Sequence, residues 1–207
     1  MKPLATVPVS LASHSYDILV GGQLLDNTGE ILRKRFGAHK ILLVTDDQVA
    51  QLYLPRLRAS LAREDYDAAE IIVPAGEGSK DFSCFEMLVT DMLRAGIARD
   101  SLVVALGGGV VGDLAGFAAS VVLRGVDYVQ VPTTLLAQVD SAIGGKTAIN
   151  TSLGKNLVGS FHQPKLVVAD TSLLETLPRR ELLAGYAEVV KYGLLGDSQF
   201  FSWLEEH

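Results

Sequence analysis

The sequence predicts an α/β protein: a doubly wound, Rossmann-like, mostly parallel sheet with flanking helices, followed by the start of an α-helical domain. Short apolar runs rich in β-branched residues alternate along the chain with stretches of helical spacing. Three consecutive glycines, Gly107 to Gly109, directly follow the apolar run 101–106 and open a helical segment. Strand-like runs stop before residue 178, so we expect an α/β domain over 1–177 and the beginning of a helical domain over 178–207.

The predicted elements follow one another in a regular order. Alternating apolar residues predict a hairpin-like pair of strands at 6–12 and 16–21. Short apolar runs predict buried strands at 40–45, 68–74, 101–106, 126–132 and 165–170. Helical periodicity between and after these strands predicts helices at 22–36, 46–64, 80–95, 110–123 and 178–195, with a further helix beginning at 198. Pro178 falls near the first turn of the helix 178–195, where proline is favoured.

Composition excludes several classes of protein. The 207 residues are 48% hydrophobic and 20% charged, which is ordinary for a soluble globular chain with a sizeable core. A net charge of −6, without a cluster of lysines and arginines, argues against a nucleic-acid partner. Asp113 and several glycines interrupt the longest apolar span, and the N-terminus has no uninterrupted apolar stretch, so we expect neither a membrane helix nor a signal peptide. The single cysteine, Cys84, excludes an internal disulfide and fits a reducing compartment, which predicts a cytoplasmic protein.

One segment breaks the alternation. Residues 133–163 are rich in glycine and polar side chains and have weak periodicity, so we expect an irregular segment there. A segment of this length without regular structure inside a compact domain is usually functional or disordered, and its aliphatic content argues against disorder. The "GGKT" at 144–147 is not the end of a Walker A loop, because the glycine required five positions before Gly145 is replaced by Asp140.

Four polar or glycine-rich loops each follow a predicted strand: "TDDQ" after 40–45, "GEGSK" after 68–74, the glycine turn after 101–106, and "PTT" after 126–132. The carboxyl ends of parallel strands share one edge of the sheet, and ligands of open α/β sheets gather at that edge. We therefore expect a ligand site built from these loops.

The glycine turn allows three interpretations. Gly107, Gly109 and Gly112 match the G-x-G-x-x-G template for a backbone that approaches a pyrophosphate. The acidic residue expected about 20 positions later is missing, and the nearest acid is Asp113 inside the turn. The turn is therefore a dinucleotide site, another phosphate cradle at a helix N-terminus, or only a tight turn. Asp113 is either a favourable partner of the helix dipole or a contact to a ribose or substrate.

Two further groups of polar residues are candidates for chemistry. The irregular region concentrates basic and polar side chains, namely Arg124, Asp140, Lys146, Lys155, Asn156 and His162. Two lysines beside glycines favour neutralisation of a phosphate or carboxylate over two independent solvated charges. On the helix 178–195 one stripe is apolar, and the opposite side carries Glu188 with Glu181, Ala184, Lys191 and Tyr192. That side is either a solvated face or the lining of a cleft, with Glu188 available to a metal or a substrate hydroxyl.

Four runs, "GGGVVGDLAGFAAS", "RGVDYVQVPTTLLAQVDSAIGGKTAIN", "LGKNLVGSFHQP" and "GYAEVVKYG", resemble the signature runs of the 3-dehydroquinate synthases. The resemblance extends from about residue 40 to the end and is densest over 101–193. It implies a carbon–oxygen lyase that depends on NAD and a divalent metal (zinc or cobalt) and acts in the shikimate pathway. The implied reaction cyclises 3-deoxy-D-arabino-heptulosonate 7-phosphate, a small sugar phosphate, to 3-dehydroquinate with release of phosphate. Alternatives are a cyclase of the valiolone or scyllo-inosose type, a metal-dependent polyol dehydrogenase, or a non-catalytic NAD-binding module.

The resemblance also implies roles for individual residues. Cofactor-binding positions are Asp46, Glu77 to Lys80, Gly108 to Asp113 (with Gly109 and Val110), Thr133, Thr134, Lys146, Lys155, and Leu173 to Thr176. Active-site positions are Asp140, Lys146, Asn156, Lys191 and Arg124, with Glu188 as one of three metal ligands. The arginine corresponding to Arg124 reaches the substrate phosphate of a neighbouring subunit, which implies a homodimer.

One departure from the family pattern concerns the metal. The family's other two ligands are histidines of a C-terminal helical domain, whereas this chain has only His14, His39, His162 and His207, and none lies in such a domain. We interpret His162 as a non-ligand. The chain is therefore expected to be an N-terminal part of the enzyme, inactive by itself and without a tightly bound metal.

Overall fold

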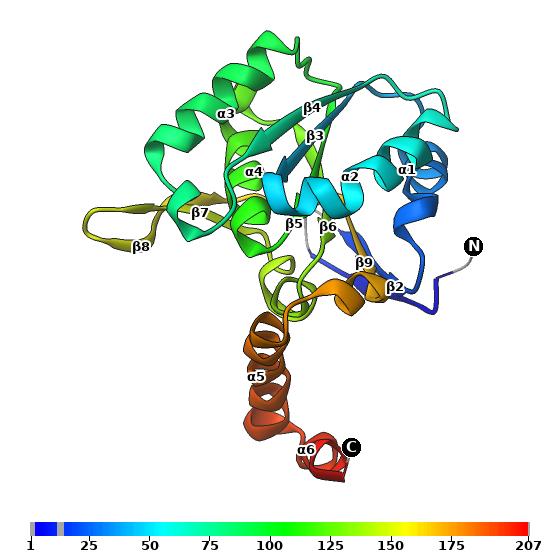
Figure 1. Cartoon of the computed structure of the whole chain (residues 1–207), viewed down its shortest axis with the longest axis vertical. Helices are drawn as coiled ribbons and strands as arrows, with labels where there is room; N and C mark the ends of the chain where they lie inside the picture. Colours follow the sequence, from blue (N-terminus) through cyan, green and yellow to red (C-terminus); the bar gives the residue numbers. More distant parts are fainter. Residues whose placement is uncertain (1–2, 12–14, 207) are drawn as a thin grey trace.

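The computed structural model describes residues 3–11 and 15–206, and its centre is a seven-stranded sheet. The strands lie in the order β1-β2-β9-β6-β5-β3-β4. Their bounds are Ala5–Val9 (β1), Tyr16–Gly21 (β2), Ile41–Asp46 (β3), Ala68–Val73 (β4), Leu102–Gly107 (β5), Asp127–Pro132 (β6) and Leu166–Asp170 (β9). β1 pairs antiparallel with β2, and every other neighbouring pair is parallel (Figure 1). The predicted mostly parallel sheet is thus confirmed, including the early strand pair.

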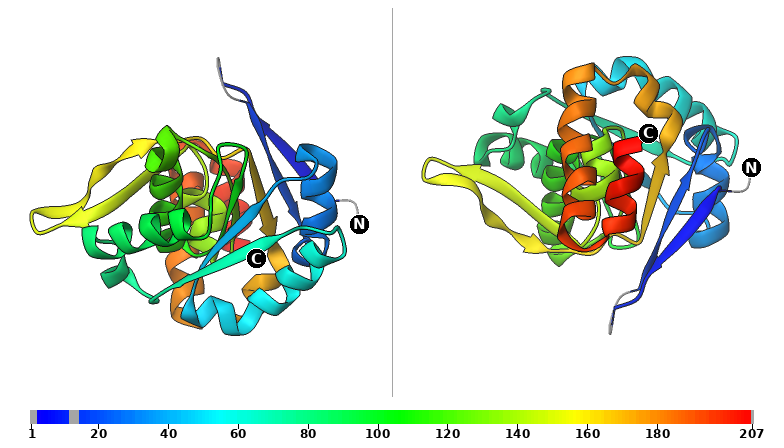
Figure 2. Two further views of the ribbon diagram at one scale, coloured as in Figure 1. Left: turned by 90° about the horizontal axis from the view of Figure 1, so that it is seen from above. Right: turned by 90° about the horizontal axis from the view of Figure 1, so that it is seen from below.

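Helices cover both faces of the sheet, as a doubly wound fold requires (Figure 2). Helices α1 (Thr28–Phe36) and α2 (Asp47–Ala62) pack on one face, and α3 (Phe82–Arg94) and α4 (Gly109–Val121) pack on the other. Successive strand residues point to opposite faces: Ile41 and Leu43 of β3 join the first core, and Leu42 and Val44 join the second. β3 and β5 are buried throughout, which explains why they read as continuous apolar runs.

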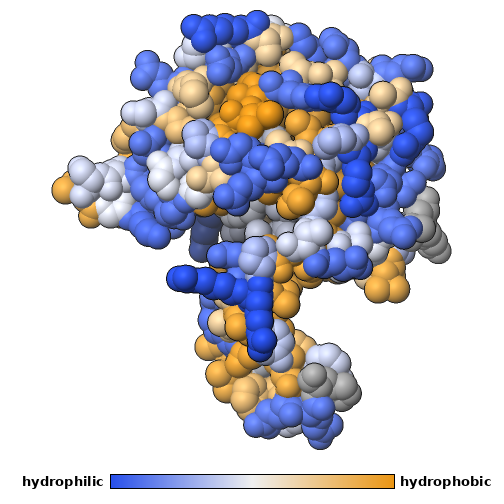
Figure 3. Space-filling view, in the orientation of Figure 1, coloured by the Kyte–Doolittle hydropathy of each residue, from blue (hydrophilic) through white to orange (hydrophobic). Residues whose placement is uncertain are grey.

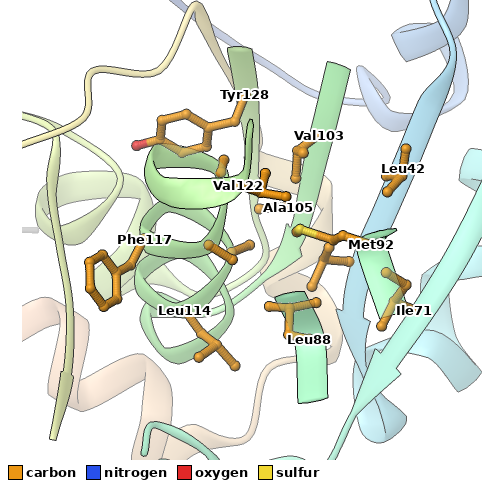
Figure 4. Packing of buried hydrophobic residues seen from close by; sticks show 14 of the residues in the cluster. Leu42, Ile71, Leu88, Met92, Val103, Ala105, Leu114, Phe117, Val122 and Tyr128 are labelled. Carbon is orange, nitrogen blue, oxygen red and sulfur yellow. The ribbon is translucent and has the colours of Figure 1, made fainter. Parts of the chain in front are cut away.

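The second core fixes the position of α4. Leu114 and Phe117 of α4 lie with Leu88 and Met92 of α3 against the central strands (Figure 4). Tyr128 of β6 is fully buried behind α4, at the edge of this core. The helix begins directly after the glycine turn, so this packing also fixes the turn.

The expectation of an irregular segment over 133–163 is wrong for most of its length. It contains a π-helical turn, η4 (Ala137–Ser141), and an antiparallel hairpin of β7 (Lys146–Thr151) and β8 (Gly154–Phe161). The hairpin lies outside the main sheet, packs its base on α4 and extends away from the body (Figure 1). Its outer half is largely exposed, so the sequence lacks the alternation that a half-buried strand produces.

The predicted C-terminal helices are present as α5 (Arg179–Gly196) and α6 (Ser198–Glu206), and they extend from the body (Figure 1). The first predicted helix begins later than expected, with the short turn η1 (Leu25–Asn27) before α1. Short 3₁₀ turns also occupy η2 (Glu77–Ser79), η3 (Val122–Arg124) and η5 (Thr171–Thr176). Among the described residues no helix combines the length and the apolar character needed to cross a membrane.

Helix α5 is exposed on most of its surface, and among its residues Gly185 and Gly193 are buried. Leu183, Tyr186 and Leu194 of the predicted apolar stripe are exposed, and apolar surface is visible along α5 and α6 in Figure 3. The side toward the body carries Gly185, where an added Cβ would lie 2.5 Å from the Leu136 nitrogen. Of the polar side, Glu188 is half-buried and the Tyr192 hydroxyl contacts the body, whereas Glu181, Ala184 and Lys191 are exposed.

Candidate functional site

The strand order creates a crevice between β3 and β5. The chain leaves β3 through α2 to reach β4 on one side, and it leaves β5 through α4 to reach β6 on the other. This reversal is the topological switch point, where open α/β sheets bind their ligands beyond the carboxyl ends of the strands. Asp46 ends β3 and Gly107 ends β5, so the loops predicted as a ligand site flank this crevice.

The glycine turn is closely packed. A Cβ added at Gly108 would lie 3.1 Å from Cγ2 of Thr134, and one at Gly109 would lie 2.8 Å from Oγ of Ser141. The hydrogen bond from the Thr133 nitrogen to the Gly107 carbonyl, 3.0 Å, joins the turn to the loop after β6. This packing explains the glycines even as a tight turn.

Two further observations at the turn point to an anion. Helix α4 has no side-chain cap at Gly108, so its first backbone N–H groups remain available to a ligand. The hydroxyl oxygen of Ser141, directly beside Gly109, is buried and has no hydrogen-bond partner among the described residues. A nucleotide phosphate bound at the turn would accept hydrogen bonds from the free N–H groups of α4 and from the Ser141 hydroxyl. This crevice therefore fits a dinucleotide.

Asp46 is a helix cap. Its Oδ1 accepts hydrogen bonds from the nitrogens of Gln48 (3.0 Å) and Val49 (2.8 Å). This role fixes the carboxylate at the carboxyl end of β3, beside the crevice.

A buried ion pair joins two of the predicted cofactor loops. Lys80 follows η2 and is 5% exposed; its Nζ donates to Oδ2 of Asp113 in α4 and to Oδ1 of Asn156 at 2.5 Å. Burial raises the pKa of Asp113, and the bond and charge of Lys80 oppose that rise. The dipole interpretation of Asp113 is therefore incomplete, because this carboxylate also has a buried cationic partner.

A cleft of about 470 Å³ lies between η4, the hairpin and α4. Its lining includes Asp113, Asp140, Ser141, Lys146 and Asn156. Three of the five predicted catalytic residues, Asp140, Lys146 and Asn156, are therefore brought together, although they come from three different elements. The cleft carries both a cation and carboxylates, which suits a ligand with a phosphate and several hydroxyls.

The remaining predicted catalytic residues lie elsewhere. Lys191 pairs with Glu188 on α5, and the Tyr192 hydroxyl donates to the Val139 carbonyl at 3.2 Å, which places this side of α5 against η4. The bond to Glu188 raises the pKa of Lys191, and the charge of Asp140 adds to that effect. These contacts bring α5 next to η4, which carries Asp140 of the cleft, although no residue of α5 itself lines the cleft. Arg124 is exposed beyond the opposite end of α4, a helix that is about 18 Å long at 1.5 Å per residue.

The other predicted cofactor residues have structural partners. The Tyr53 hydroxyl donates to the Leu173 carbonyl at 2.8 Å and also contacts the Thr176 hydroxyl, which fixes η5 against α2. Oγ1 of Thr134 accepts from the Ala137 nitrogen at 3.2 Å and so caps η4. Lys155 is an exposed residue of β8 that pairs with Glu77 at 3.4 Å.

The residues present do not form a metal site. Within the part of the chain that the structure describes, no three carboxylate, thiolate or imidazole side chains lie together as metal ligands, so Glu188 belongs to no complete ligand set. His39 contacts the backbone carbonyls of Phe36 and Asp100, and His162 contacts that of Val126, while His14 and His207 lie outside the described residues. One carboxylate does not hold a zinc ion alone.

Sequence reasoning missed Ser141 and Asn150. Ser141 lies beside the predicted Asp140, but only the fold shows that its hydroxyl reaches the glycine turn. Asn150 and Asn156 flank the turn of the hairpin, and asparagine near a turn is a signal for special backbone geometry.

Comparison with known proteins agrees with this geometry. The family model described as 3-dehydroquinate synthase N-terminal matches residues 70–184. A 3-dehydroquinate synthase of Rhodospirillum rubrum is 54% identical over 203 residues, which cover 98% of this chain and 53% of that protein.

Two solved structures share the fold. ValA, a 2-epi-5-epi-valiolone synthase from Streptomyces hygroscopicus with NAD+ and Zn2+ bound, matches with a TM-score of 0.87 and 36% identity, covering 96% of this chain and 55% of that one. A 2-deoxy-scyllo-inosose synthase complexed with carbaglucose-6-phosphate, NAD+ and Co2+ matches with a TM-score of 0.83 and 29% identity, covering 90% and 50%. The chain thus spans about half the length of the relatives that it matches. The match to the family model, together with the identity to the Rhodospirillum rubrum enzyme, shows that this chain belongs to the 3-dehydroquinate synthase family.

Proposed function

We propose that the chain supplies the NAD-binding site and much of the sugar-phosphate site of a 3-dehydroquinate synthase. The reaction would cyclise 3-deoxy-D-arabino-heptulosonate 7-phosphate to 3-dehydroquinate with loss of phosphate, in the shikimate pathway. The observation that carries this proposal is the position of the cleft, which adjoins the glycine turn and shares Asp113 and Ser141 with it. The identity to curated 3-dehydroquinate synthases favours this cyclase over the valiolone and scyllo-inosose types.

In this proposal the chain positions two ligands. NAD, when bound, supplies a reversible hydride acceptor for a ring hydroxyl. The N-terminus of α4 holds the dinucleotide phosphates, and Lys146 and Asn156 hold the substrate phosphate from the hairpin side of the cleft. Asp140 lies in the same cleft, within reach of substrate hydroxyls. Lys80 and Asp113 already form an ion pair in the protein, so their charges are not available to either ligand. In this proposal the pair lies at the boundary between the two ligands.

A divalent metal would need ligands in addition to Glu188. The described residues bring no three such ligands together, while the related cyclases that hold Zn2+ or Co2+ are nearly twice as long as this chain. We therefore expect the 207-residue chain to bind NAD without completing the reaction.

Arg124 suggests how a second subunit takes part. It is exposed beyond the far end of α4, so its guanidinium lies outside the cleft of its own chain. A homodimer would let Arg124 reach the phosphate in the neighbouring cleft. The single thiol, Cys84, is buried and unpaired, as suits a cytoplasmic enzyme.

Calorimetric titration with NAD tests the proposal. The wild-type chain should bind NAD, and Gly109→Val should abolish binding because its side chain would fill the space beside the turn. Gly22→Val is the matched control, since nothing lies within 4 Å of a Cβ at Gly22. Thermal unfolding of each variant shows that it remains folded. Equal NAD binding by the wild type and a folded Gly109→Val variant would show that the glycine turn is only a turn.

Competition among sugar phosphates tests the specificity. In the presence of NAD, the heptulosonate 7-phosphate should bind more tightly than sedoheptulose 7-phosphate or glucose 6-phosphate. A preference for either of the latter two would favour a different cyclase.

A further inference from the structure

We propose that Asn150 is a positioning residue of this site, which locks the loop 77–80 on the nucleotide side to Asn156 on the cleft side. Its role in ligand binding rests on the proposed function, because that function places Lys80 at the boundary between the two ligands and Asn156 at the substrate phosphate. The contacts that define the lock are present in the protein without any ligand.

Asn150 lies at an irregularity of the hairpin. Ile149 pairs with Val158 and Thr151 pairs with Gly154, so Asn150 alone stands opposite the three residues 155–157. Asn156, the middle residue of this bulge, has a φ of +57°, in the left-handed region that costs a side-chain-bearing residue energy. Bulges beside active sites redirect side chains, and a contact must hold such a backbone in place.

The side chain of Asn150 provides that contact. Its Oδ1 accepts a hydrogen bond from the Asn156 nitrogen at 3.0 Å. Its Nδ2 donates to Oε1 of Glu77 at 2.7 Å. Its backbone nitrogen donates to the Lys80 carbonyl at 2.7 Å. One residue thus bonds to both ends of the loop 77–80 and to the bulge.

These bonds close a ring through the buried lysine. Nζ of Lys80 donates to Oδ1 of Asn156, whose own nitrogen is held by Asn150. The ring therefore sets the direction of the Asn156 side chain, which lines the cleft, relative to the lysine that pairs with Asp113. Removing the Asn150 side chain leaves the Asn156 N–H without its acceptor and the bulge free to relax.

The other link between the loop and the hairpin is weaker. Lys155 approaches Glu77 at 3.4 Å, but the lysine side chain is 72% exposed, and exposed ion pairs contribute little. Burial works against ionisation of Glu77, yet the Asn150 hydrogen bond and the charges of Lys155 and Lys80 together lower the pKa of Glu77. Glu77 is therefore a carboxylate at neutral pH and a strong acceptor for Asn150.

Three variants of the 207-residue chain separate the contacts. Asn150→Ala removes both side-chain bonds. Asn150→Asp retains the shape and the acceptor for the Asn156 N–H, but it places a second carboxylate against Glu77. When Glu77→Gln is added to Asn150→Asp, the new amide at position 77 can donate to the new carboxylate at position 150. The hydrogen bond is thereby restored with donor and acceptor exchanged. Asn27→Ala is the matched control, because that side chain bonds only the nearby Gln23 carbonyl, on the opposite edge of the sheet.

Two measurements distinguish a positioning role from a merely structural one: amide hydrogen exchange at Asn156 by NMR, and NAD affinity by calorimetry. Asn150→Ala should accelerate the exchange and weaken NAD binding by about tenfold, the effect of losing one good hydrogen bond to a charged group. Asn150→Asp should leave the exchange slow and still weaken NAD binding. The double variant should bind NAD more tightly than Asn150→Asp, and Asn27→Ala should match the wild type in both measurements.

The outcomes are separable. If the wild type binds NAD and Asn150→Ala binds it equally, or if the double variant recovers nothing, the positioning role is wrong while the proposed function stands. If the wild type binds no NAD, the proposed function and the positioning role fail together. Unchanged exchange at Asn156 in Asn150→Ala would show that Asn150 does not hold the bulge. Should Asn150→Ala fail to fold, the comparison of Asn150→Asp with the double variant decides the question.

Discussion

Replacing Lys80 by methionine should destabilise the chain, because it leaves the carboxylate of Asp113 buried without a cation. The two side chains are 6% and 17% exposed, and Lys80 also donates to Asn156. Methionine retains most of the length of the lysine side chain, so the change removes the charge and its hydrogen bonds with little loss of packing.

The size of the effect follows from the burial of the pair. Removing one partner of a buried ion pair costs about 3–5 kcal/mol. The partial exposure of Asp113 favours the lower end, about 3 kcal/mol, and the lost bond to Asn156 adds about 1 kcal/mol. A loss of about 4 kcal/mol is a large part of the 5–15 kcal/mol that typically stabilises a domain.

The loss should depend on pH in a defined direction. Burial already raises the pKa of Asp113, and without Lys80 it rises further. A carboxyl group with a raised pKa in the folded state favours folding below its unfolded pKa, and that contribution is lost as pH rises through the folded pKa. The variant should therefore approach the wild type in acid and fall increasingly below it toward neutral pH.

Urea denaturation followed by circular dichroism, from about pH 4 to about pH 8, measures both effects. Lys34→Met is the matched control, because its ion pair with Glu30 is exposed and should contribute little to stability. Adding Asp113→Asn to Lys80→Met removes the unpaired charge and should recover most of the loss. The reasoning is refuted if Lys80→Met costs no more than Lys34→Met, if its cost is the same at every pH, or if Asp113→Asn recovers nothing.

Three further predictions concern other parts of the chain. Gly159→Ala should cost at least about 2 kcal/mol in urea denaturation, because its Cβ would lie 2.0 Å from a backbone carbonyl oxygen of β7, whereas Gly22→Ala should be nearly neutral. The hydrogen bond from Arg56 lowers the pKa of Asp26, so the stability that this bond gives is lost as the pH falls through the pKa of Asp26 in the folded state. Arg56→Gln should therefore raise the pKa of Asp26 in an NMR titration. The pair is partly exposed, so the effect on stability should be under about 1 kcal/mol. After incubation with zinc and dialysis, elemental analysis should find no stoichiometric metal in the wild type or in Glu188→Gln. This prediction is contradicted if the wild type retains one zinc ion per chain and Glu188→Gln does not.

Local pattern predicted most of the main sheet and its helices. β3, β5 and β6 are nearly all buried, so their apolar runs stand out between helical segments. The glycine turn was predicted because glycine is required where a strand passes into a closely packed helix N-terminus. The hairpin β7–β8 was missed because much of it is exposed and a bulge interrupts its alternation. Its residues therefore carry no period-two signal.

The candidate site was predicted as a set of loops, because parallel strands bring their carboxyl ends to one edge in any doubly wound order. Which side chains meet in that site was not predictable in the same way. Lys80 reaches Asp113 and Asn156, residues 33 and 76 positions away, because tertiary packing brings the loop after β4, helix α4 and the hairpin together. Likewise α5 contacts the body through Gly185, which allows a close approach to Leu135 and Leu136, and not through its predicted apolar stripe, of which Leu183, Tyr186 and Leu194 are exposed.

The sequence by itself thus determined most of the elements, the glycine turn and the edge of the sheet where the ligand site is proposed, since each depends on the periodicity and conformational preference of neighbouring residues. Only the tertiary structure decided the strand order, the bulge that aims Asn156, the burial of the lysine–aspartate pair and the orientation of α5. These depend on contacts between distant segments, where packing and desolvation outweigh local preference.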